Sequence, residues 1–360
     1  MERRAFLKQA GVAGLAASAI AAPAIAAEPQ IRWRLASSFP KSLDTIYGGA
    51  EVLADRVREL TDGKFDIRVF AGGEIVPGLQ VLDAVSNGTV EIGHTCSYYY
   101  VGKNKAFGFD TSMPFGLNSR QQNAWMQFGG GDKLMAELFD QYKVIALAGG
   151  NTGTQMGGWF RKEIKSVNDL KGMKMRIAGL AGAVLAKLGV VPQQIASGDI
   201  YPALEKGTID ATEWVGPYDD QKMGFNKVAK YYYYPGWWEG GPEVDFFVNQ
   251  KAFDGLSAEN KAIIEAATNV AHVDMLAKYD AMNPKALKQL VAAKTKVLPF
   301  SQAVMDASFK ASMEVFAQND AKSPEWKKIY ADMRNFQRDQ ILWFRFAESR
   351  FDTFMSSKKL

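Results

Sequence analysis

Cysteine and histidine are scarce in this chain of 360 residues. The single cysteine, Cys96, has no second cysteine with which to form a disulfide inside the chain. The two histidines, His94 and His272, are too few for a histidine-rich metal site. A disulfide scaffold and a metal centre of that kind are therefore both excluded.

The sequence also lacks a long run of one charge sign. Its 43 basic and 39 acidic residues are interspersed and give a formal net charge of +4. Nucleic-acid binding needs a concentrated basic face, so we expect no nucleic-acid partner. A hydrophobic content of 47% with 23% charged residues is typical of globular proteins, and the length predicts two lobes of about 150 residues each.

The common enzyme signatures are missing as well. There is no G-x-G-x-x-G after a strand, no Walker A loop, no H-E-x-x-H and no G-x-S-x-G. The segment from Ser38 to Lys41 matches S-x-x-K, but its S-D-N and K-T-G partners are absent. Cys96 is predicted to be a small buried residue in a strand. We therefore expect a protein that is not an enzyme.

The first 26 residues are predicted to be a signal peptide. They contain the basic start Arg3-Arg4-Ala5-Phe6-Leu7-Lys8, an uncharged alanine-rich stretch and the ending Ala24-Ile25-Ala26. The paired arginines resemble a twin-arginine signal, although Glu2 departs from its usual pattern; a general secretory signal is the alternative. Either route predicts export to the periplasm.

Apolar residues then follow helix and strand periodicities in alternation, which predicts an α/β protein. Strands are expected at residues 31–36, 65–69, 90–96 and 295–298. The first helix presents one apolar face, formed by Ile46, Ala50, Leu53, Val57 and Leu60.

A long helix is predicted from Ser257 to near Pro284, and two further helices after residue 298. The last helix is rich in aromatic residues, namely Trp343, Phe344, Phe346, Phe351 and Phe354. Such a concentration near a chain end favours a docked or dimerising helix.

A local pattern occurs twice. Gly88 ends a predicted helix and leads into a strand, and Gly207 does the same in Lys206-Gly207-Thr208-Ile209. The repetition indicates two similarly built lobes. His94 and Glu213 then occupy matching positions toward the carboxyl ends of their strands, where open α/β sheets bind ligands.

Three segments carry candidate binding residues. The glycine-rich segment 149–159 contains Asn151 and Gln155, and a plain turn between lobes is the alternative. Arg176 is expected near the end of a buried strand, where a guanidinium can hold a carboxylate by two hydrogen bonds; a solvated arginine is the alternative. Glu213 lies beside Trp214, ahead of an aromatic cluster at 231–238. A purely structural role is the alternative for this cluster.

Together these segments resemble the solute-binding proteins of tripartite ATP-independent periplasmic (TRAP) transporters, and within them the subgroup that binds 2-oxo acids such as pyruvate, or lactate, with a metal ion. The resemblance rests on 33–40, 149–153, 173–176, 198–204 and 211–218. It implies two α/β lobes around a cleft, with hinge strands and a long helix spanning both.

The implied division is residues 27–150 with about 243–283 for one lobe, and 151–242 with about 284–325 for the other. Residues 326–360 form a terminal helix that could dimerise.

The resemblance also implies roles for single residues. Arg176 clamps the carboxylate of the ligand. Gln155, Glu213 and the backbone carbonyl of Trp214 hold the ion. Weaker assignments to the ligand are Asn151, Tyr98, Tyr99, Tyr100 and Glu239.

The implied function is capture of a small 2-oxo or 2-hydroxy monocarboxylate, delivered to membrane permease subunits. Oxygen ligands with one carboxylate suit Na⁺, with Ca²⁺ as the alternative. We expect Arg176 and the ion to grip the acid from opposite sides of a mobile cleft. We also expect replacement of Arg176 by alanine to change the stability of the empty protein little. A receptor for larger acids or sugars and an exported enzyme remain alternatives.

Overall fold

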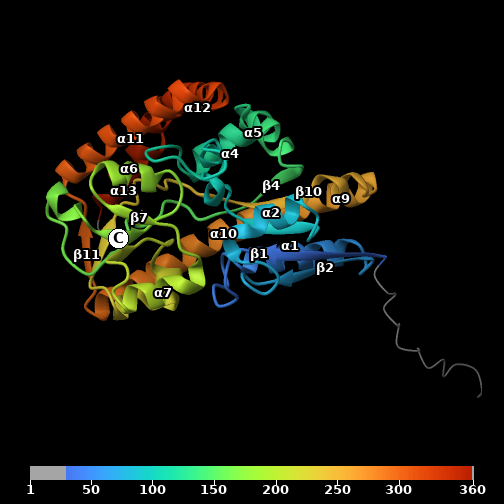
Figure 1. Cartoon of the computed structure of the whole chain (residues 1–360), viewed down its shortest axis with the longest axis horizontal. Helices are drawn as coiled ribbons and strands as arrows, with labels where there is room; N and C mark the ends of the chain where they lie inside the picture. The colour runs from blue at the N-terminus through green and yellow to red at the C-terminus, as the bar shows by residue number, and fades with distance from the viewer. Residues whose placement is uncertain (1–29, 359–360) are drawn as a thin grey trace, which may run out of the picture.

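The computed structural model describes residues 30–358, which form two β-sheets with helices packed on them (Figure 1). This confirms the predicted two-lobed α/β class. The predicted signal peptide, residues 1–26, lies outside the described residues. The exact limits of the two lobes stay a prediction, which the separation into two sheets supports.

Lobe 1 is the first sheet with its helices. Its strand order is β2-β1-β3-β10-β4, and β10 runs antiparallel to both of its neighbours. The strands are β1 (Ile31–Ser37), β2 (Phe65–Phe70), β3 (Ile92–Thr95), β4 (Val144–Asn151) and β10 (Glu243–Asn249). Parallel β1 and β3 end at the same edge, so the loops that follow them meet there.

The helices of lobe 1 are mostly short. They are α1 (Gly48–Leu60), α2 (Val81–Ser86), α3 (Phe107–Thr111), α4 (Ser119–Phe128), α5 (Gly131–Asp140) and α9 (Gln250–Asp254). Leu53 and Val57 of α1 are fully buried against the sheet, as the predicted apolar face requires. Leu60 is 57% exposed because α1 ends there, so that face is one residue shorter than predicted.

Lobe 2 contains the second sheet, in the order β11-β9-β5-β8-β6-β7, with β5 antiparallel to its neighbours. Its strands are β5 (Trp159–Phe160), β6 (Lys174–Arg176), β7 (Val191–Gln193), β8 (Ala211–Thr212), β9 (Tyr231–Tyr234) and β11 (Lys296–Pro299). Its helices are α6 (Ala181–Lys187), α7 (Ser197–Glu205) and α8 (Pro217–Met223).

The repeated helix–glycine–strand pattern is confirmed. Gly88 and Gly207 have φ angles of +77° and +73°, which glycine adopts without the strain of a side chain. The amide of Thr89 bonds Ala84 O at 2.8 Å, and that of Thr208 bonds Ala203 O at 2.9 Å. Each turn leads to an interior strand of its sheet, β3 in lobe 1 and β8 in lobe 2.

Two loop segments and one long helix run between the lobes. We call residues 152–158, between β4 and β5, and residues 235–242, between β9 and β10, the crossing segments. Helix α10 (Ala258–Ala292) packs on α1 and β4 of lobe 1 and on α8 of lobe 2, so it spans both (Figure 1).

The predicted end of this helix near Pro284 is wrong. Pro284 lies inside α10, which continues for two more turns and buries Ala286 and Leu290. This packing offsets the hydrogen bond that a proline cannot donate.

The C-terminal prediction is also incomplete, since three helices rather than two follow β11 within the described residues. Helix α11 (Gln302–Lys322) packs on α6, whereas α12 (Pro324–Phe346) returns to lobe 1 and packs on α4 and α5 (Figure 1). Trp326 of α12 is fully buried beside Phe109. Helix α13 (Glu348–Ser356) follows and buries none of its side chains.

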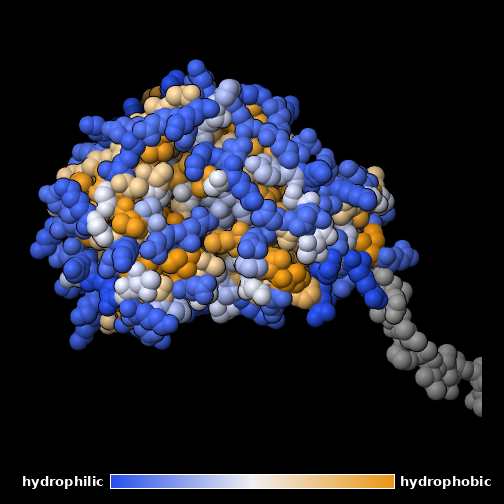
Figure 2. Space-filling model, viewed as in Figure 1, coloured by the Kyte–Doolittle hydropathy of each residue, from blue (hydrophilic) through white to orange (hydrophobic). Residues whose placement is uncertain are grey.

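Within residues 30–358, none of the helices has the length and apolar character needed to cross a membrane. The face in Figure 2 is largely hydrophilic, with apolar residues in scattered groups.

Candidate functional site

A small cavity lies where the two lobes and both crossing segments meet. Its lining is Ile46, Cys96, Tyr98, Tyr99, Thr152, Gln155, Trp214, Val215 and Pro242. The cavity volume is about 10 Å³, so side chains from both lobes nearly fill the space. The segments that follow β1, β3, β4 and β8 all contribute, as expected for the carboxyl edge of an α/β sheet.

Strand β6 places Arg176 beside this cavity. The side chain is 1% exposed and forms an ion pair with Glu213. It also donates hydrogen bonds to the Ile195 and Glu213 carbonyls, both at 3.2 Å, and its guanidinium lies 5.2 Å from the Trp214 ring centre. Burial opposes the charge, but Glu213, together with Tyr99, Tyr98 and Glu239, more than compensates and raises the pKa of Arg176. The site thus holds a fixed positive charge away from water.

Glu213 directly follows β8 and is completely buried. One oxygen, Oε1, accepts from Arg176 and from the Ala178 amide. The other, Oε2, has no hydrogen-bond partner among the described residues. Burial raises the pKa of Glu213 and Arg176 opposes that rise.

Arg176 and Glu213 therefore come from neighbouring strands of one sheet. Both residues belong to lobe 2, so the expectation that Arg176 and the ion grip the acid from opposite sides of the cleft stays a prediction.

Three more unpartnered oxygens come from the crossing segments. Gln155 donates to Thr152 Oγ1 at 3.2 Å, while its Oε1 lacks a partner in the described part of the chain. Neither carboxylate oxygen of Glu239 has a hydrogen-bond partner among the described residues. Burial and the charge of Glu213 raise the pKa of Glu239. The backbone amide of Gln155 donates to the backbone carbonyl of Glu239 at 3.1 Å. A Cβ at Gly236 would lie 2.8 Å from the backbone oxygen of Gln155. Glycine at 236 thus allows the two crossing segments to touch.

These oxygens suit a hard cation. A buried polar atom without a partner is costly, and Gln155, Glu213 and Glu239 each have at least one among the described residues. Carboxylate and amide oxygens are the ligands that Na⁺ and Ca²⁺ prefer. No cluster of three or more His, Cys, Asp or Glu side chains able to hold a metal occurs in residues 30–358, so the donor set does not favour Zn²⁺.

Four predicted ligand contacts lie outside the lining, namely Arg176, Glu239, Tyr100 and Asn151, and the last two bind other parts of the protein. The Tyr100 hydroxyl accepts from the Leu82 amide at 3.1 Å and pairs with Thr95 Oγ1 at 3.0 Å, so it belongs to the core of lobe 1. Asn151 donates to Gly241 O at 2.9 Å and accepts from the Gly153 amide at 2.9 Å. Asn151 thus joins the two crossing segments rather than facing the cavity.

The aromatic cluster at 231–238 also lies elsewhere. Tyr233 stacks on Phe300, and Trp237 stacks on Phe115. None of the cluster lines the cavity among the described residues, so the feature that favoured a sugar ligand is structural.

Sequence reasoning missed five lining residues. They are Ile46, Cys96, Thr152, Val215 and Pro242. Cys96 is 3% exposed, as predicted, but also forms part of the wall. Its position just after β3 was the available signal, because strand ends define the site. His94 is fully buried and lies outside the lining; burial lowers its pKa to about 3.

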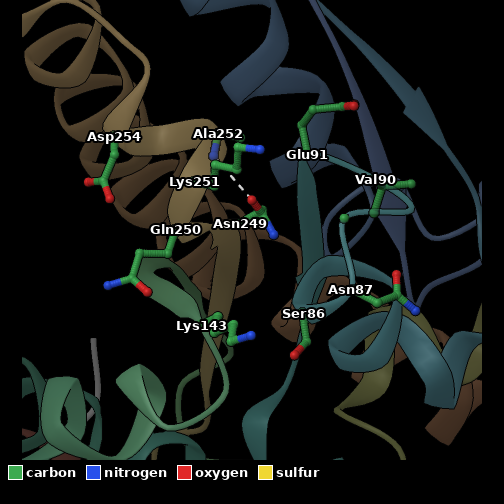
Figure 3. Close-up of a pocket in the computed structure, with 11 residues that line it drawn as sticks. Ser86, Asn87, Val90, Glu91, Lys143, Asn249, Gln250, Lys251, Ala252 and Asp254 are labelled. Atoms are coloured by element: carbon green, nitrogen blue, oxygen red, sulfur yellow. Dashed lines mark hydrogen bonds between the residues drawn. The ribbon is translucent and has the colours of Figure 1, made fainter.

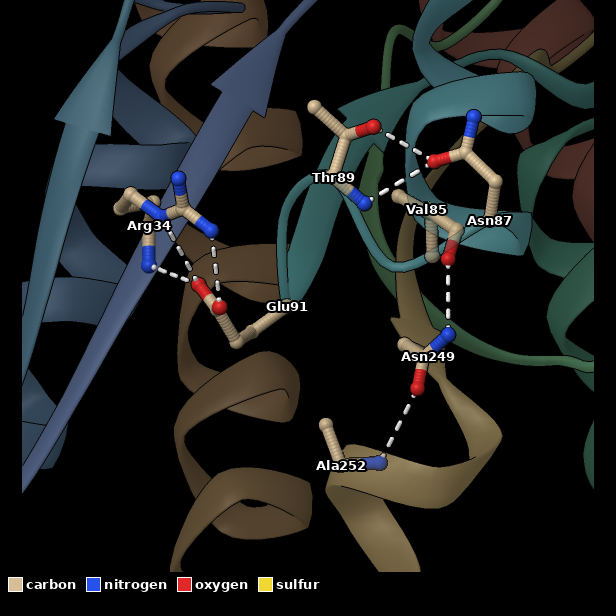
Figure 4. Close-up of polar contacts among 7 residues, drawn as sticks. All are labelled: Arg34, Val85, Asn87, Thr89, Glu91, Asn249 and Ala252. Carbon is tan, nitrogen blue, oxygen red and sulfur yellow. Dashed lines mark hydrogen bonds and ion pairs between the residues drawn. The ribbon is translucent and has the colours of Figure 1, made fainter.

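A larger surface cavity of about 710 Å³ lies at the far edge of lobe 1, between α2 and α9 (Figure 3). Figure 4 shows partners for three of its polar side chains, Asn87, Glu91 and Asn249. Glu91 pairs with Arg34 at 3.0 Å, and Asn249 donates to Val85 O at 2.8 Å and accepts from the Ala252 amide at 3.1 Å. The inter-lobe cavity has the unpartnered oxygen of Gln155 in its lining and the ion pair of Arg176 with Glu213 beside Trp214, so it is the better candidate.

Comparison with known proteins identifies the family of this chain. The model of the bacterial extracellular solute-binding proteins, family 7, matches residues 36–322. A monocarboxylate 2-oxoacid-binding periplasmic protein of a Nostoc strain is 51% identical over 92% of this chain and 91% of its own length.

Solved structures extend the similarity to the fold. A TRAP transporter solute-binding protein from Bordetella bronchiseptica is 55% identical with a TM-score of 0.90, over 92% of this chain and 98% of that one. It is described as a mixed-occupancy dimer with copurified calcium and picolinate. A TRAP solute-binding protein from Pseudoalteromonas atlantica with bound sodium and pyruvate is 42% identical with a TM-score of 0.87, over 91% of this chain and 99% of that one.

Proposed function

Because this chain belongs to the bacterial extracellular solute-binding proteins of family 7, we propose that it captures a small 2-oxo or 2-hydroxy monocarboxylate, such as pyruvate or lactate, together with a cation. It is a TRAP solute-binding protein, and it delivers the captured acid to the permease subunits of the transporter. The periplasm is the proposed location, reached by the twin-arginine signal. We assign it no catalytic activity.

One observation carries the proposal: a fully buried arginine lies beside buried acidic and amide oxygens that lack partners. A guanidinium in a dry site binds a carboxylate with two parallel, charge-assisted hydrogen bonds. Arg176 would hold the carboxylate of the acid with the N–H groups that its bonds to Ile195 and Glu213 leave available. The ligands bound by the Bordetella and Pseudoalteromonas relatives support an acid of this size.

Gln155, Glu213 and the Trp214 carbonyl would hold the cation, with Na⁺ favoured and Ca²⁺ as the alternative. A bound hard cation would supply positive charge to the carboxylate and the neighbouring carbonyl oxygen of a 2-oxo acid. Tyr98, Tyr99 and Glu239 complete the proposed wall around the ligand. We do not propose Tyr100 or Asn151 as contacts, because their polar groups bind the protein itself.

We also propose a homodimer that uses an exposed surface near the C-terminus. We call this surface the terminal aromatic patch; it consists of Ile341, Leu342, Trp343 and Phe346 of α12 and Phe351 and Phe354 of α13, each between 47% and 73% exposed. Exposed apolar groups of this density favour a protein partner. The dimer of the Bordetella relative supports a second copy as that partner.

Calorimetry with pyruvate tests the ligand. We expect dissociation constants near the micromolar range with sodium or calcium present, and loss of binding after chelation in a sodium-free buffer. Wild-type affinity without either cation would refute the proposed role of the cation in binding. Binding of hexoses with no response to 2-oxo or 2-hydroxy acids would refute the ligand class.

A further inference from the structure

A cluster of charged and polar side chains bridges the lobes outside the cavity. Asp44 lies in the loop between β1 and α1 of lobe 1 and is 49% exposed. It forms an ion pair with Lys222 of α8 in lobe 2, and its Oδ2 accepts from the Tyr218 hydroxyl of the same helix at 3.2 Å. Lys278 of α10 donates to the Asp44 carbonyl at 2.6 Å and lies 3.2 Å from Oδ2.

The loop that presents Asp44 is held in place on both sides. Leu43 and Thr45 flank Asp44 and are 0% and 2% exposed. The Tyr47 amide bonds Leu43 O at 2.9 Å, which closes the loop into a turn. Asp44 therefore cannot follow α8 if the lobes separate, and its bonds to Tyr218 and Lys222 must break.

Helix α8, which carries Tyr218 and Lys222, is anchored to α10. Tyr279 of α10 donates to Asp219 at 2.7 Å, and the Tyr218 amide donates to Asn283 at 3.0 Å. Helix α8 therefore moves with the lobe-2 end of α10. Lys278 lies at the point of α10 where its contacts change from lobe 1 to lobe 2, because Met275 packs on Gly49 and Gly150 whereas Tyr279 binds Asp219.

The Asp44 loop and the segment before α8 both contribute residues to the lining of the ligand cavity. Ile46, two residues after Asp44, lines the cavity, and so do Trp214 and Val215, which lie one residue before the start of α8. Contacts of a ligand with these segments would bring α8 to the Asp44 loop. The bonds of Asp44 form only when the lobes are together, so they favour the same state as the ligand does.

We propose that Asp44 is a positioning residue that latches the closed state through Lys222, Tyr218 and Lys278, and so raises affinity without touching the ligand. The inference rests on the proposed function only in using pyruvate as its probe. A ligand that needs the closed state binds more weakly when that state is less populated. Because the pair is partly exposed, its contribution is modest and sensitive to ionic strength.

The test compares Asp44→Asn with Asp55→Asn as a matched control, since Asp55 pairs with Arg58 inside α1 and does not bridge the lobes. With pyruvate and excess calcium, we expect Asp44→Asn to raise the dissociation constant about threefold to tenfold and Asp55→Asn to leave it unchanged. Lys222→Met should weaken binding alone and have much less effect in the Asp44→Asn background. Choline chloride, which leaves the sodium concentration fixed, should reduce the difference between parent and Asp44→Asn.

Equal affinities for the parent and Asp44→Asn, or fully additive losses in the double variant, would overturn the latch and leave the proposed function standing. If the parent binds no 2-oxo acid, the proposed function fails and the latch is judged by lobe separation alone. Spin labels at Glu59→Cys and Lys162→Cys, both exposed and on different lobes, measure it in the ligand-free protein. A longer mean separation in Asp44→Asn supports the latch, and an unchanged distribution overturns it.

Discussion

At the scale of single residues, the pairing of Arg176 with Glu213 changes what removal of the arginine should do. Both side chains are at most 1% exposed, so Arg176→Ala would leave the Glu213 carboxylate buried without its countercharge. Loss of one partner of a buried pair costs about 3–5 kcal/mol. The buried pair therefore argues against the expectation that the stability of the empty protein changes little.

We predict that Arg176→Ala abolishes pyruvate binding and lowers the free energy of unfolding by about 3 kcal/mol or more. Calorimetry and urea denaturation measure the two effects. Arg120→Ala is the control, because Arg120 pairs with Glu348 at the surface and its loss should cost about 1 kcal/mol or less. An Arg176→Ala protein as stable as the parent would mean that the buried pair does not form in the empty protein.

Asp219 gives a pH prediction. Burial, and to a smaller extent Asp220, raises the pKa of Asp219 from 3.8 to about 7. The folded protein thus holds this proton more tightly than the unfolded chain. The stability contributed by the protonated form is complete below pH 3.8 and is lost as the pH rises toward about 7.

Asp219→Asn should therefore become more stable relative to the parent as the pH rises through this window, because the amide cannot ionise and still accepts from Tyr279. We expect a gain of about 1 kcal/mol or more at pH 8 and none near pH 4. Urea denaturation at both pH values measures it, with exposed Asp339→Asn as the control. The same difference at both pH values would contradict the argument.

At the scale of elements, α10 shows how tertiary packing overrides a local stop signal. Pro284 is exposed inside this 35-residue helix, while Ala286 and Leu290 beyond it are buried. The burial of those residues extends the helix past the point where a proline disfavours it.

We predict that Pro284→Ala stabilises the protein by about 1–3 kcal/mol, because alanine restores the missing amide and has the higher helix propensity. Lys285→Ala, at the neighbouring exposed position, should change the stability by a few tenths of a kcal/mol. Urea denaturation compares the two variants. A destabilised Pro284→Ala protein would show that the proline shapes α10 in a way that its packing needs.

At the scale of the whole molecule, α12 returns to lobe 1 and leaves the terminal aromatic patch exposed. If a second copy covers this patch, polar substitution there should prevent dimer formation without unfolding the chain. We predict that Trp343→Ser, Phe346→Ser and Phe351→Ser combined convert a dimer into a monomer.

Size exclusion with light scattering measures the mass of each species. Val273 of α10 is 66% exposed and lies outside the patch, so Val273→Ser is the matched control and should leave the mass unchanged. A monomeric parent, or a dimer that survives the three substitutions, would refute the proposed interface.

The sequence alone determined the α/β class, the helix–glycine–strand pattern at Gly88 and Gly207, and the long helix from Ser257, because periodicity and glycine placement act over a few residues. The motifs around Arg176 and Glu213 also determined the family. These are local features, and local chemistry specifies them.

Only the tertiary structure decided which side chains remain available. Asn151 and Tyr100 satisfy their hydrogen bonds inside the protein, and Arg176 pairs with Glu213. The bridge from Asp44 to Lys222 joins residues that are 178 positions apart. Such pairings depend on how distant segments meet in the folded chain, so no spacing within the sequence could have specified them.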